Sequence, residues 1–228
     1  MNSTQDKPDD LLPKIIPLSD AAVLLKFGEE ISLEINQRVH HAFRLLKVNP
    51  IPGILSMIPA YCTLMVQYDP VLNKSGDIIE ALSLLIRIHM ISGEPMQGKV
   101  IEIPVIYGGD AGPDLDFVAS SHQLDPEEVV AIHTSRLYPV YMMGFMPGFA
   151  YLGGVDDRIA TPRLASPRQQ VVSGSVGIAG SQTGIYPLES PGGWQIIGRT
   201  PLKLFDPDRD PPSLLSPGDL VRFVRLDG

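Results

Sequence analysis

The sequence has one cysteine, Cys62, and lacks the run of about 20 apolar residues that a membrane helix needs. A single cysteine cannot form a disulfide within the chain. Positive charge is also scarce, because 18 Lys and Arg stand against 26 Asp and Glu in 228 residues, a formal net charge of −8. These absences exclude a disulfide scaffold and argue against membrane and nucleic-acid binding. The polar N-terminus has no signal-peptide core, so the sequence favours the cytoplasm.

Glycine and proline are distributed unevenly along the chain. Residues 1–97 contain 8 Pro and 4 Gly, whereas residues 98–228 contain 14 Pro and 17 Gly. The second part must therefore consist largely of short strands and sharp turns. We predict a flexible leader over residues 1–17, an α+β domain over 18–97 and a β-barrel domain over 98–228.

In the first domain, hydrophobic periodicity predicts two helices. Apolar residues recur at helical spacing from Ile31 to Leu46 and again from Asp77 to Ile86. Four segments are predicted to be strands, namely 21–27, 53–58, 61–68 and 100–105. The order strand-helix-strand-strand-helix-strand is that of a ferredoxin-like unit, whose last strand would extend to about residue 106.

The second domain is predicted to contain two short helices followed only by strands. One helix covers residues 114–121, and the other begins after Asp125, with Pro126 at its first position and two glutamates in its first turn. The clearest strands are 140–143, 170–172, 195–197 and 220–224. Strands of this length separated by turn signals indicate a closed or nearly closed β-barrel, and the fold class of the chain is α+β.

Charge is locally inverted between Arg158 and Phe205. This window holds five cationic residues, Arg158, Arg163, Arg168, Arg199 and Lys203, and a single acid, Glu189, a net charge of +4. Such a window favours an anionic ligand, because the arginine fork binds a carboxylate or phosphate with two parallel hydrogen bonds. The alternative is that these arginines are solvated or pair with acids elsewhere.

Residues 174–184 contain four glycines together with Ser175, Gln182 and Thr183. Glycine at this density lets backbone N–H groups approach a ligand, and the polar side chains add donors that could polarise a carbonyl oxygen. A pair of tight barrel turns is the alternative. The spacing matches neither the phosphate-binding loop nor the dinucleotide fingerprint.

Residues 144–154 place Phe145, Phe149 and Tyr151 among glycines and a proline, a composition suited either to the wall of a cleft or to core packing. Upstream, His133 is the side chain best suited to proton transfer near neutral pH, although a lone histidine often serves only as a structural hydrogen-bonding group. The sequence has no spacing of zinc ligands and no complete calcium loop, so no metal site is predicted in this chain.

These segments together resemble the family of the 5-oxoprolinase B subunit. The family also includes the sporulation-kinase inhibitor KipI, and its members are often named allophanate hydrolase subunit 1. In the C-terminal half the resemblance rests on His133-Thr-Ser, 144–154, Pro167-Arg168, 174–180, 182–194 and 197–201. In the N-terminal half it rests on Phe27-Gly28, 58–61, 68–70 and 103–105.

The resemblance implies a small α+β domain followed by a cyclophilin-like β-barrel. It also implies that the chain works with the A and C subunits of the enzyme to open the lactam of 5-oxoproline, a small anionic amide, to glutamate. The assembled complex would consume ATP with Mg²⁺ as the accompanying cofactor, and both would be bound mainly outside this chain. Hydrolase activity is therefore expected of the complex.

We assign hypothetical roles to the singled-out residues from their chemistry. Arg168 or Arg199 would bind the substrate carboxylate beside Ser175 and Gly180. Gln182 and Thr183 would face the activated carbonyl, and His133 would relay a proton. The wall of the cleft, or an interface, would be formed by Phe145, Phe149, Tyr151, Tyr186 and Trp194.

Three other functions stay open at this point. A KipI-like inhibitor would dock on a histidine kinase through the surface of residues 145–151, without catalysis. A component of an allophanate hydrolase or a related amide hydrolase would share the same motifs. A prolyl isomerase would follow only from analogy with the barrel fold.

Overall fold

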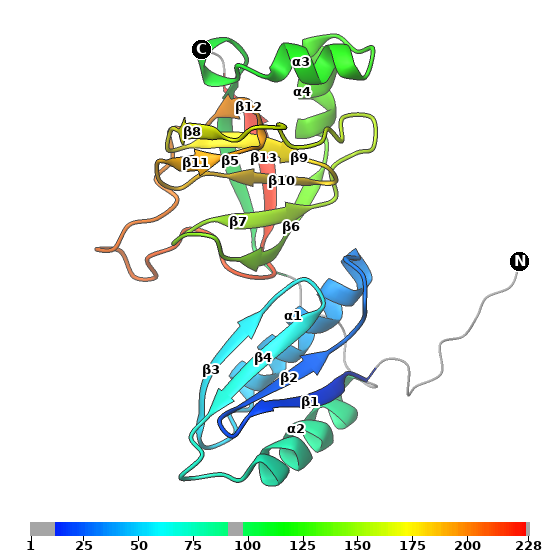
Figure 1. Cartoon of the computed structure of the whole chain (residues 1–228), viewed down its shortest axis with the longest axis vertical. Coiled ribbons are helices and arrows are strands. Elements are labelled where there is room, and N and C mark those ends of the chain that lie inside the picture. Colours follow the sequence, from blue (N-terminus) through cyan, green and yellow to red (C-terminus); the bar gives the residue numbers. More distant parts are fainter. Residues whose placement is uncertain (1–11, 91–97, 227–228) are drawn as a thin grey trace, which may run out of the picture. The chain divides into compact units, whose positions relative to one another are not determined.

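The computed structural model describes residues 12–90 and 98–226, which form two compact units divided after Gln97 (Figure 1). The first unit is a four-stranded sheet with two helices, and the second contains a closed seven-stranded barrel. The predicted α+β class and the closed barrel are therefore confirmed. Within the described residues, none of the helices has the length and apolar character needed to cross a bilayer.

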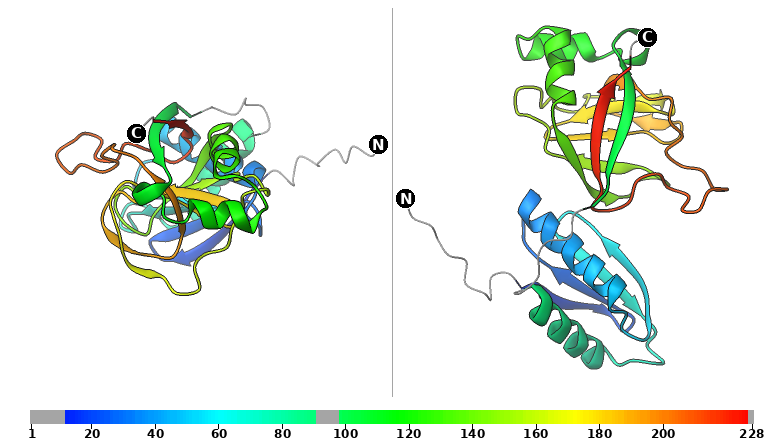
Figure 2. Two further views of the ribbon diagram at one scale, coloured as in Figure 1. Left: turned by 90° about the horizontal axis from the view of Figure 1, so that it is seen from above. Right: turned by 180° about the vertical axis from the view of Figure 1, so that it is seen from behind.

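Both helices of the first unit pack on one face of its sheet (Figure 2, right). The elements are β1 (Lys14–Ser19), β2 (Ala22–Lys26), α1 (Leu33–Val48), β3 (Ile54–Pro59), β4 (Thr63–Tyr68) and α2 (Ser75–Met90), with strand order β1-β2-β4-β3. Helix α1 begins after Ser32, whose side chain accepts a hydrogen bond from the Ile35 N–H at 3.1 Å. Val23 and Val66 lie in the core between sheet and helices.

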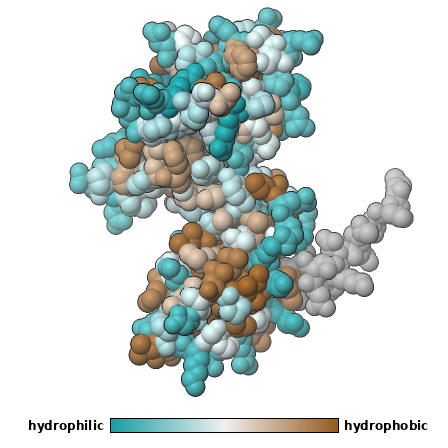
Figure 3. Space-filling view, in the orientation of Figure 1, coloured by the Kyte–Doolittle hydropathy of each residue, from teal (hydrophilic) through white to brown (hydrophobic). Residues whose placement is uncertain are grey.

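The other face of this sheet carries no helix. A row of apolar residues crosses it in register, from Ile16 on β1 through Leu24 and Met65 to Ile58 on β3. Side chains alternate along a strand, so these residues point away from the helices. Figure 3 accordingly shows apolar surface over the sheet of the first unit.

Two predictions for this unit are corrected. The leader was predicted to extend to residue 17, but β1 begins at Lys14 and pairs with β2 through a tight hairpin; residues 1–11 lie outside the described residues. The strand predicted to complete a ferredoxin-like unit is β5 (Val100–Tyr107), which pairs with β13 and β12 in the barrel. Consequently β1, and not β5, is the fourth strand of the first sheet.

The barrel closes in the order β10-β7-β6-β13-β5-β12-β9. Besides β5, its strands are β6 (Leu137–Met143), β7 (Ala150–Gly153), β9 (Ser175–Ala179), β10 (Gln182–Ile185), β12 (Gln195–Arg199) and β13 (Leu220–Arg225). Strands β5 and β13 run parallel, and the other pairs are antiparallel. A separate ribbon joins β8 (Arg168–Val171) to β11 (Ser190–Gly192).

The helices of the second unit follow β5. They are the short 3₁₀ helix η2 (Gly109–Ala111), α3 (Leu115–Ser121) and α4 (Pro126–Thr134). The predicted start of α4 is confirmed, because Asp125 and Glu128 form a capping box. The four predicted strands are present as parts of β6, β8, β12 and β13.

The glycine-rich segment 174–184 is the β9–β10 hairpin and not an extended ligand-binding loop. Its glycines have a packing role, because a Cβ at Gly177 or Gly184 would lie 3.0 or 2.9 Å from atoms of the Trp194 side chain. The turn is made by Gly180, which has a positive φ of 59°. This hairpin agrees with the alternative interpretation of the segment as tight barrel structure.

Candidate functional site

An aromatic pocket of about 280 Å³ opens on the barrel unit. It is lined by Phe145, Phe149, Tyr151, Arg163, Pro167, Tyr186, Pro191, Gly192, Gly193 and Trp194. These residues come from the β6–β7 turn, the strand β7, the segment before β8, the residue after β10, the strand β11 and the two residues before β12. The five aromatic residues that the sequence predicted as a cleft wall are therefore brought together in one pocket.

Phe149 is the centre of this aromatic cluster. Its ring centroid lies 4.9 Å from that of Tyr151, 5.3 Å from Tyr186 and 5.6 Å from Trp194, in edge-to-face geometry each time. Phe149, Tyr186 and Trp194 are buried, and Tyr151 is half-buried. Edge-to-face pairs of this kind hold the rings in fixed orientations, so the apolar wall of the pocket is rigid.

Glycine at position 192 gives the wall its shape. A Cβ at Gly192 would lie 2.4 Å from the Tyr186 hydroxyl oxygen, so no larger residue fits without moving that ring. Burial raises the pKa of the Tyr186 hydroxyl, which therefore stays protonated and available as a hydrogen-bond donor at neutral pH.

Arg163 supplies the positive charge of the aromatic pocket. Its guanidinium carbon lies 5.7 Å from the centre of the Trp194 ring, within cation–π range. Within residues 12–90 and 98–226 no carboxylate pairs with Arg163, and the side chain is exposed. The pocket thus combines apolar rings with an arginine whose fork is available to an oxyanion.

Phe145 stands at the rim of the pocket in an uncommon conformation. It has a positive φ of 70°, a region that bulky residues rarely adopt, and 63% of the residue is exposed. Its ring makes an edge-to-face contact with Phe149. Strain combined with exposure of a large apolar residue is characteristic of functional surfaces.

Arg168, predicted together with Arg199 as a candidate for substrate binding, makes internal contacts. Its Nη2 donates to Asp114 Oδ1 at 2.5 Å, and its Nη1 donates to the carbonyl oxygen of Trp194 at 3.4 Å. The other oxygen of Asp114 accepts the Ile196 N–H at 2.6 Å. This guanidinium therefore already has partners, and through the Trp194 carbonyl it supports the backbone of the aromatic pocket.

His133, predicted as a proton relay, lies in a buried polar chain formed by Tyr107, His133, Thr183 and Gly177. Thr183 Oγ1 donates to the Gly177 carbonyl at 2.9 Å and lies 3.0 Å from His133 Nε2. The Tyr107 hydroxyl lies 2.8 Å from His133 Nδ1. Because the threonine proton is used on Gly177, Nε2 must carry the histidine proton, and Nδ1 accepts from Tyr107.

Complete burial lowers the pKa of His133 to about 3, so the imidazole is neutral at physiological pH. Both ring nitrogens have partners, and His133 and Thr183 have 0% exposure. Neither residue lines the aromatic pocket. This placement does not support direct contact of either residue with a substrate.

The remaining predicted polar residues also lie apart from the aromatic pocket. Ser175 is buried at the start of β9, Gly180 forms the hairpin turn, and Gln182 is half-buried opposite Gly153 at the start of β10. Their positions follow from the hairpin, which agrees with the interpretation of this segment as tight barrel turns.

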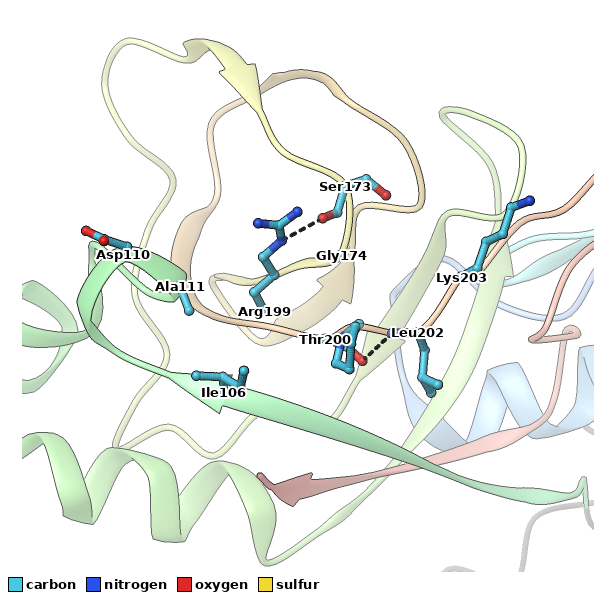
Figure 4. Close-up of a pocket in the computed structure, with 10 residues that line it drawn as sticks. Ile106, Asp110, Ala111, Ser173, Gly174, Arg199, Thr200, Leu202 and Lys203 are labelled. Atoms are coloured by element: carbon cyan, nitrogen blue, oxygen red, sulfur yellow. Dashed lines mark hydrogen bonds between the residues drawn. The ribbon is translucent and has the colours of Figure 1, made fainter. Parts of the chain in front are cut away.

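Arg199 lines a different hollow, the basic pocket, of about 560 Å³ (Figure 4). Its lining consists of Ile106, Asp110, Ala111, Ser173, Gly174, Arg199, Thr200, Pro201, Leu202 and Lys203. The two predicted arginines, Arg168 and Arg199, are thus not part of one site. Arg163, which lies in the aromatic pocket, belongs to the same cationic window, but no role was predicted for it. Among the described residues, no group of three or more His, Cys, Asp or Glu is arranged to hold a metal ion.

Known proteins are similar to this chain in both sequence and fold. The family described as carboxyltransferase domain, subdomain C and D, matches residues 13–215. The chain is 46% identical over 227 residues to the B subunit of 5-oxoprolinase from Bacillus subtilis (strain 168), covering 93% of this chain and 92% of that protein. It is 44% identical over 210 residues to the B subunit of 5-oxoprolinase from Escherichia coli O157:H7, covering 91% and 93%.

Among solved structures, the crystal structure of TTHA0988 in space group P212121 superposes with a TM-score of 0.80 at 40% identity. The match covers 92% of this chain and 41% of that chain. This chain therefore spans about two fifths of the length of TTHA0988, and almost the whole length of the two 5-oxoprolinase relatives.

Proposed function

Because this chain belongs to the family of the carboxyltransferase domain, subdomain C and D, we propose that it acts as the B subunit of an ATP-dependent 5-oxoprolinase, together with the A and C subunits. The high identity to 5-oxoprolinase relatives of the same length supports this reaction over the other candidates. The observation that carries the site is the aromatic pocket, which joins rigid apolar walls to the exposed guanidinium of Arg163.

The reaction needs both activation and charge stabilisation. A lactam carbonyl is a poor electrophile, and transfer of a phosphoryl group from ATP to its oxygen makes the carbon attackable by water. Addition of water and cleavage of the ring C–N bond then give the free amine and an acyl phosphate, and a second water hydrolyses the acyl phosphate to inorganic phosphate and the second carboxylate of glutamate. The assembled complex would carry out these steps with Mg²⁺, and this chain would contribute substrate binding.

The aromatic pocket suits 5-oxoproline in size and chemistry. A cavity of about 280 Å³ accepts a five-membered ring but not a large ligand. The methylene groups of the ring would pack against Phe149 and Trp194, and the carboxylate would bind the fork of Arg163. The protonated Tyr186 hydroxyl adds a donor on the same wall.

His133 and Thr183 take a positioning role in this proposal. Their hydrogen bonds connect α4 to the β9–β10 hairpin, which carries Gly177 and Gly184 under the Trp194 ring. The acid or base that moves protons during ring opening would then come from another component of the complex.

The test is the variant Arg163→Ala in the reconstituted complex of the A, B and C subunits. Loss of a charge-assisted hydrogen-bonding partner is expected to raise KM for 5-oxoproline about tenfold or more. The matched control is Arg222→Ala, which removes an exposed arginine that lies outside the pocket and pairs with Glu102 at 3.6 Å. An unchanged KM in the Arg163 variant would contradict the assignment of the aromatic pocket.

One observation favours a second candidate, a non-catalytic inhibitor that docks on a histidine kinase. Phe145 is strained and exposed, as an anchor for a protein partner would be. In that case the parent chain would bind a histidine kinase and Phe145→Ala would abolish this binding. The 5-oxoprolinase proposal expects lactam turnover and no binding to the kinase. Parallel assays with allophanate and 5-oxoproline would distinguish the related amide hydrolase.

A further inference from the structure

The basic pocket is a second hollow of the barrel unit and shares no lining residue with the aromatic pocket. Its volume of about 560 Å³ is twice that of the aromatic pocket, about 280 Å³. Small-molecule sites commonly measure about 300–1,000 Å³, so the basic pocket has room for a ligand considerably larger than a five-membered ring.

Backbone hydrogen bonds preform the floor of the basic pocket. The Gly174 N–H donates to the Tyr186 carbonyl at 2.7 Å, and the Thr200 N–H donates to the Gly174 carbonyl at 2.9 Å. Gly174 has a positive φ of 85°, and a Cβ there would lie 2.3 Å from the Thr200 carbonyl oxygen. The close approach of these two segments therefore requires glycine and leaves little freedom to the floor.

Arg199 stands in the pocket between Asp110 and Ser173 (Figure 4). Its Nε donates to the Ser173 carbonyl at 3.0 Å, which orients the guanidinium. In the described part of the chain the two terminal nitrogens have no ion pair or further hydrogen bond. An arginine held through Nε with free terminal nitrogens is prepared to bind an oxyanion.

The other charges of the pocket favour a multivalent anion accompanied by a cation. Lys203 Nζ lies 3.0 Å from Asp206 and lowers the pKa of that carboxyl, and the lysine side chain is 66% exposed. Asp110 would repel a bare anion. Mg²⁺ is typically bound through one or two carboxylates plus phosphate oxygens. With Mg²⁺ present, Asp110 would be a metal ligand and would no longer repel the anion.

We propose that the basic pocket binds the phosphate groups of a nucleoside triphosphate with Mg²⁺. Arg199 and Lys203 would hold the phosphates, Asp110 would hold Mg²⁺, and Ile106 and Leu202 would give the nucleoside an apolar surface. The choice of a nucleotide rests on the proposed function, because that ring opening consumes a phosphoryl donor. The inference departs from the expectation that ATP binds mainly outside this chain.

The two pockets adjoin through one residue. The Tyr186 ring lines the aromatic pocket, while its carbonyl accepts the N–H of Gly174 in the floor of the basic pocket. The Ser173 hydroxyl likewise donates to the Pro187 carbonyl at 2.8 Å. A nucleotide and a lactam bound in these pockets would therefore be held by neighbouring segments of one barrel.

The experiment is calorimetric titration of the full chain, alone, with MgATP, inorganic triphosphate and inorganic phosphate. MgATP is expected to bind, and Arg199→Ala to weaken it about tenfold or more, whereas the control Arg222→Ala changes affinity by less than about twofold. Asp110→Asn is expected to weaken MgATP but to strengthen metal-free triphosphate, because it removes a repelling charge without emptying the pocket. Amide resonances of Ile106 and Thr200 should shift on binding.

Three results would overturn the inference: no binding of MgATP, equal affinity of the Arg199 variant, or inorganic phosphate binding as tightly as MgATP. The outcome is separable from that of the proposed function. Arg199-dependent nucleotide binding without lactam turnover in the A–B–C complex would refute the proposed function and leave the nucleotide site intact. Normal lactam turnover with no nucleotide binding by this chain would support the proposed function and refute the nucleotide site.

Discussion

The aromatic pocket and the buried polar chain of Tyr107, His133 and Thr183 lie in the same barrel unit. They differ in whether their polar groups have unused hydrogen-bonding capacity. In the pocket, Arg163 is exposed and no carboxylate within the described residues pairs with it. In the buried polar chain, the side chains of Tyr107, His133 and Thr183 form hydrogen bonds with one another and with the Gly177 carbonyl. Access to a ligand together with unused hydrogen-bonding capacity distinguishes the site from the scaffold.

The largest expected effect is a difference in the free energy of unfolding between a variant in the wall of the aromatic pocket, at Phe149, and one at its rim, at Phe145. Phe149→Ala should lower the free energy of unfolding of the barrel by about 3–5 kcal/mol, because a ring with 2% exposure would leave a cavity. The exposed Phe145→Ala should change it by less than about 0.5 kcal/mol. Urea denaturation followed by the fluorescence of Trp194, the only tryptophan, reports on this unit specifically. Equal destabilisation by both variants would contradict the arrangement.

A smaller effect tests the buried polar chain. Thr183→Val removes the hydroxyl that accepts from His133 and donates to Gly177, at a cost of about 1–3 kcal/mol in the free energy of unfolding. Turnover and KM of the reconstituted complex should stay near those of the parent protein. If turnover were lost while the free energy of unfolding was unchanged, Thr183 would have a catalytic role, as its chemistry suggested from the sequence. The buried polar chain would then be part of the functional site and not only of the scaffold.

The smallest effect is a pH dependence. The pKa of His133 is lowered from 6.5 to about 3, so below pH 6.5 the unfolded chain binds a proton that the folded chain does not. The free energy of unfolding should therefore fall as the pH drops through this window, by up to about 1.4 kcal/mol per pH unit. His133→Phe, which can keep the stacking on Phe223, should lack this contribution.

Urea denaturation at pH 6.5 and 5.5 measures the effect as a difference between the two proteins. Burial and Arg44 also lower the pKa of His41, but that contribution is common to both and cancels. The same pH dependence in parent and variant would mean that His133 becomes protonated inside the folded barrel.

Much of the fold could be predicted from local patterns. Helical periodicity predicted α1 and α2, capping chemistry predicted α4, and the change in glycine and proline content lay at the boundary between the units. The aromatic residues of the pocket could be predicted because ligand pockets are lined mainly by hydrophobic and aromatic side chains, and Phe145, Phe149 and Tyr151 stand close together in the sequence.

The polar part of the site could not be predicted in the same way. The partner of Arg168 is Asp114, 54 residues earlier, and that of His133 is Thr183, 50 residues later. Only the closure of the barrel brings these pairs together, so nothing local to Arg163, Arg168 or Arg199 indicates which arginine is left to a ligand. The strand β1 was missed because most of it, Lys14–Ser19, lies in the segment that was predicted to be a leader.

The position of β13 in the barrel has a consequence for the order in which the protein can form during synthesis. All strands of the first sheet lie within residues 14–68, so that sheet can assemble while the rest is still being translated. The barrel must wait, because Leu220–Arg225 lies between β5 and β6 and only its arrival joins them. Before β13 is available, β5 and β6 each have an unpaired edge, so a chain truncated before Leu220 is expected to combine a folded first unit with an open barrel that is prone to aggregate.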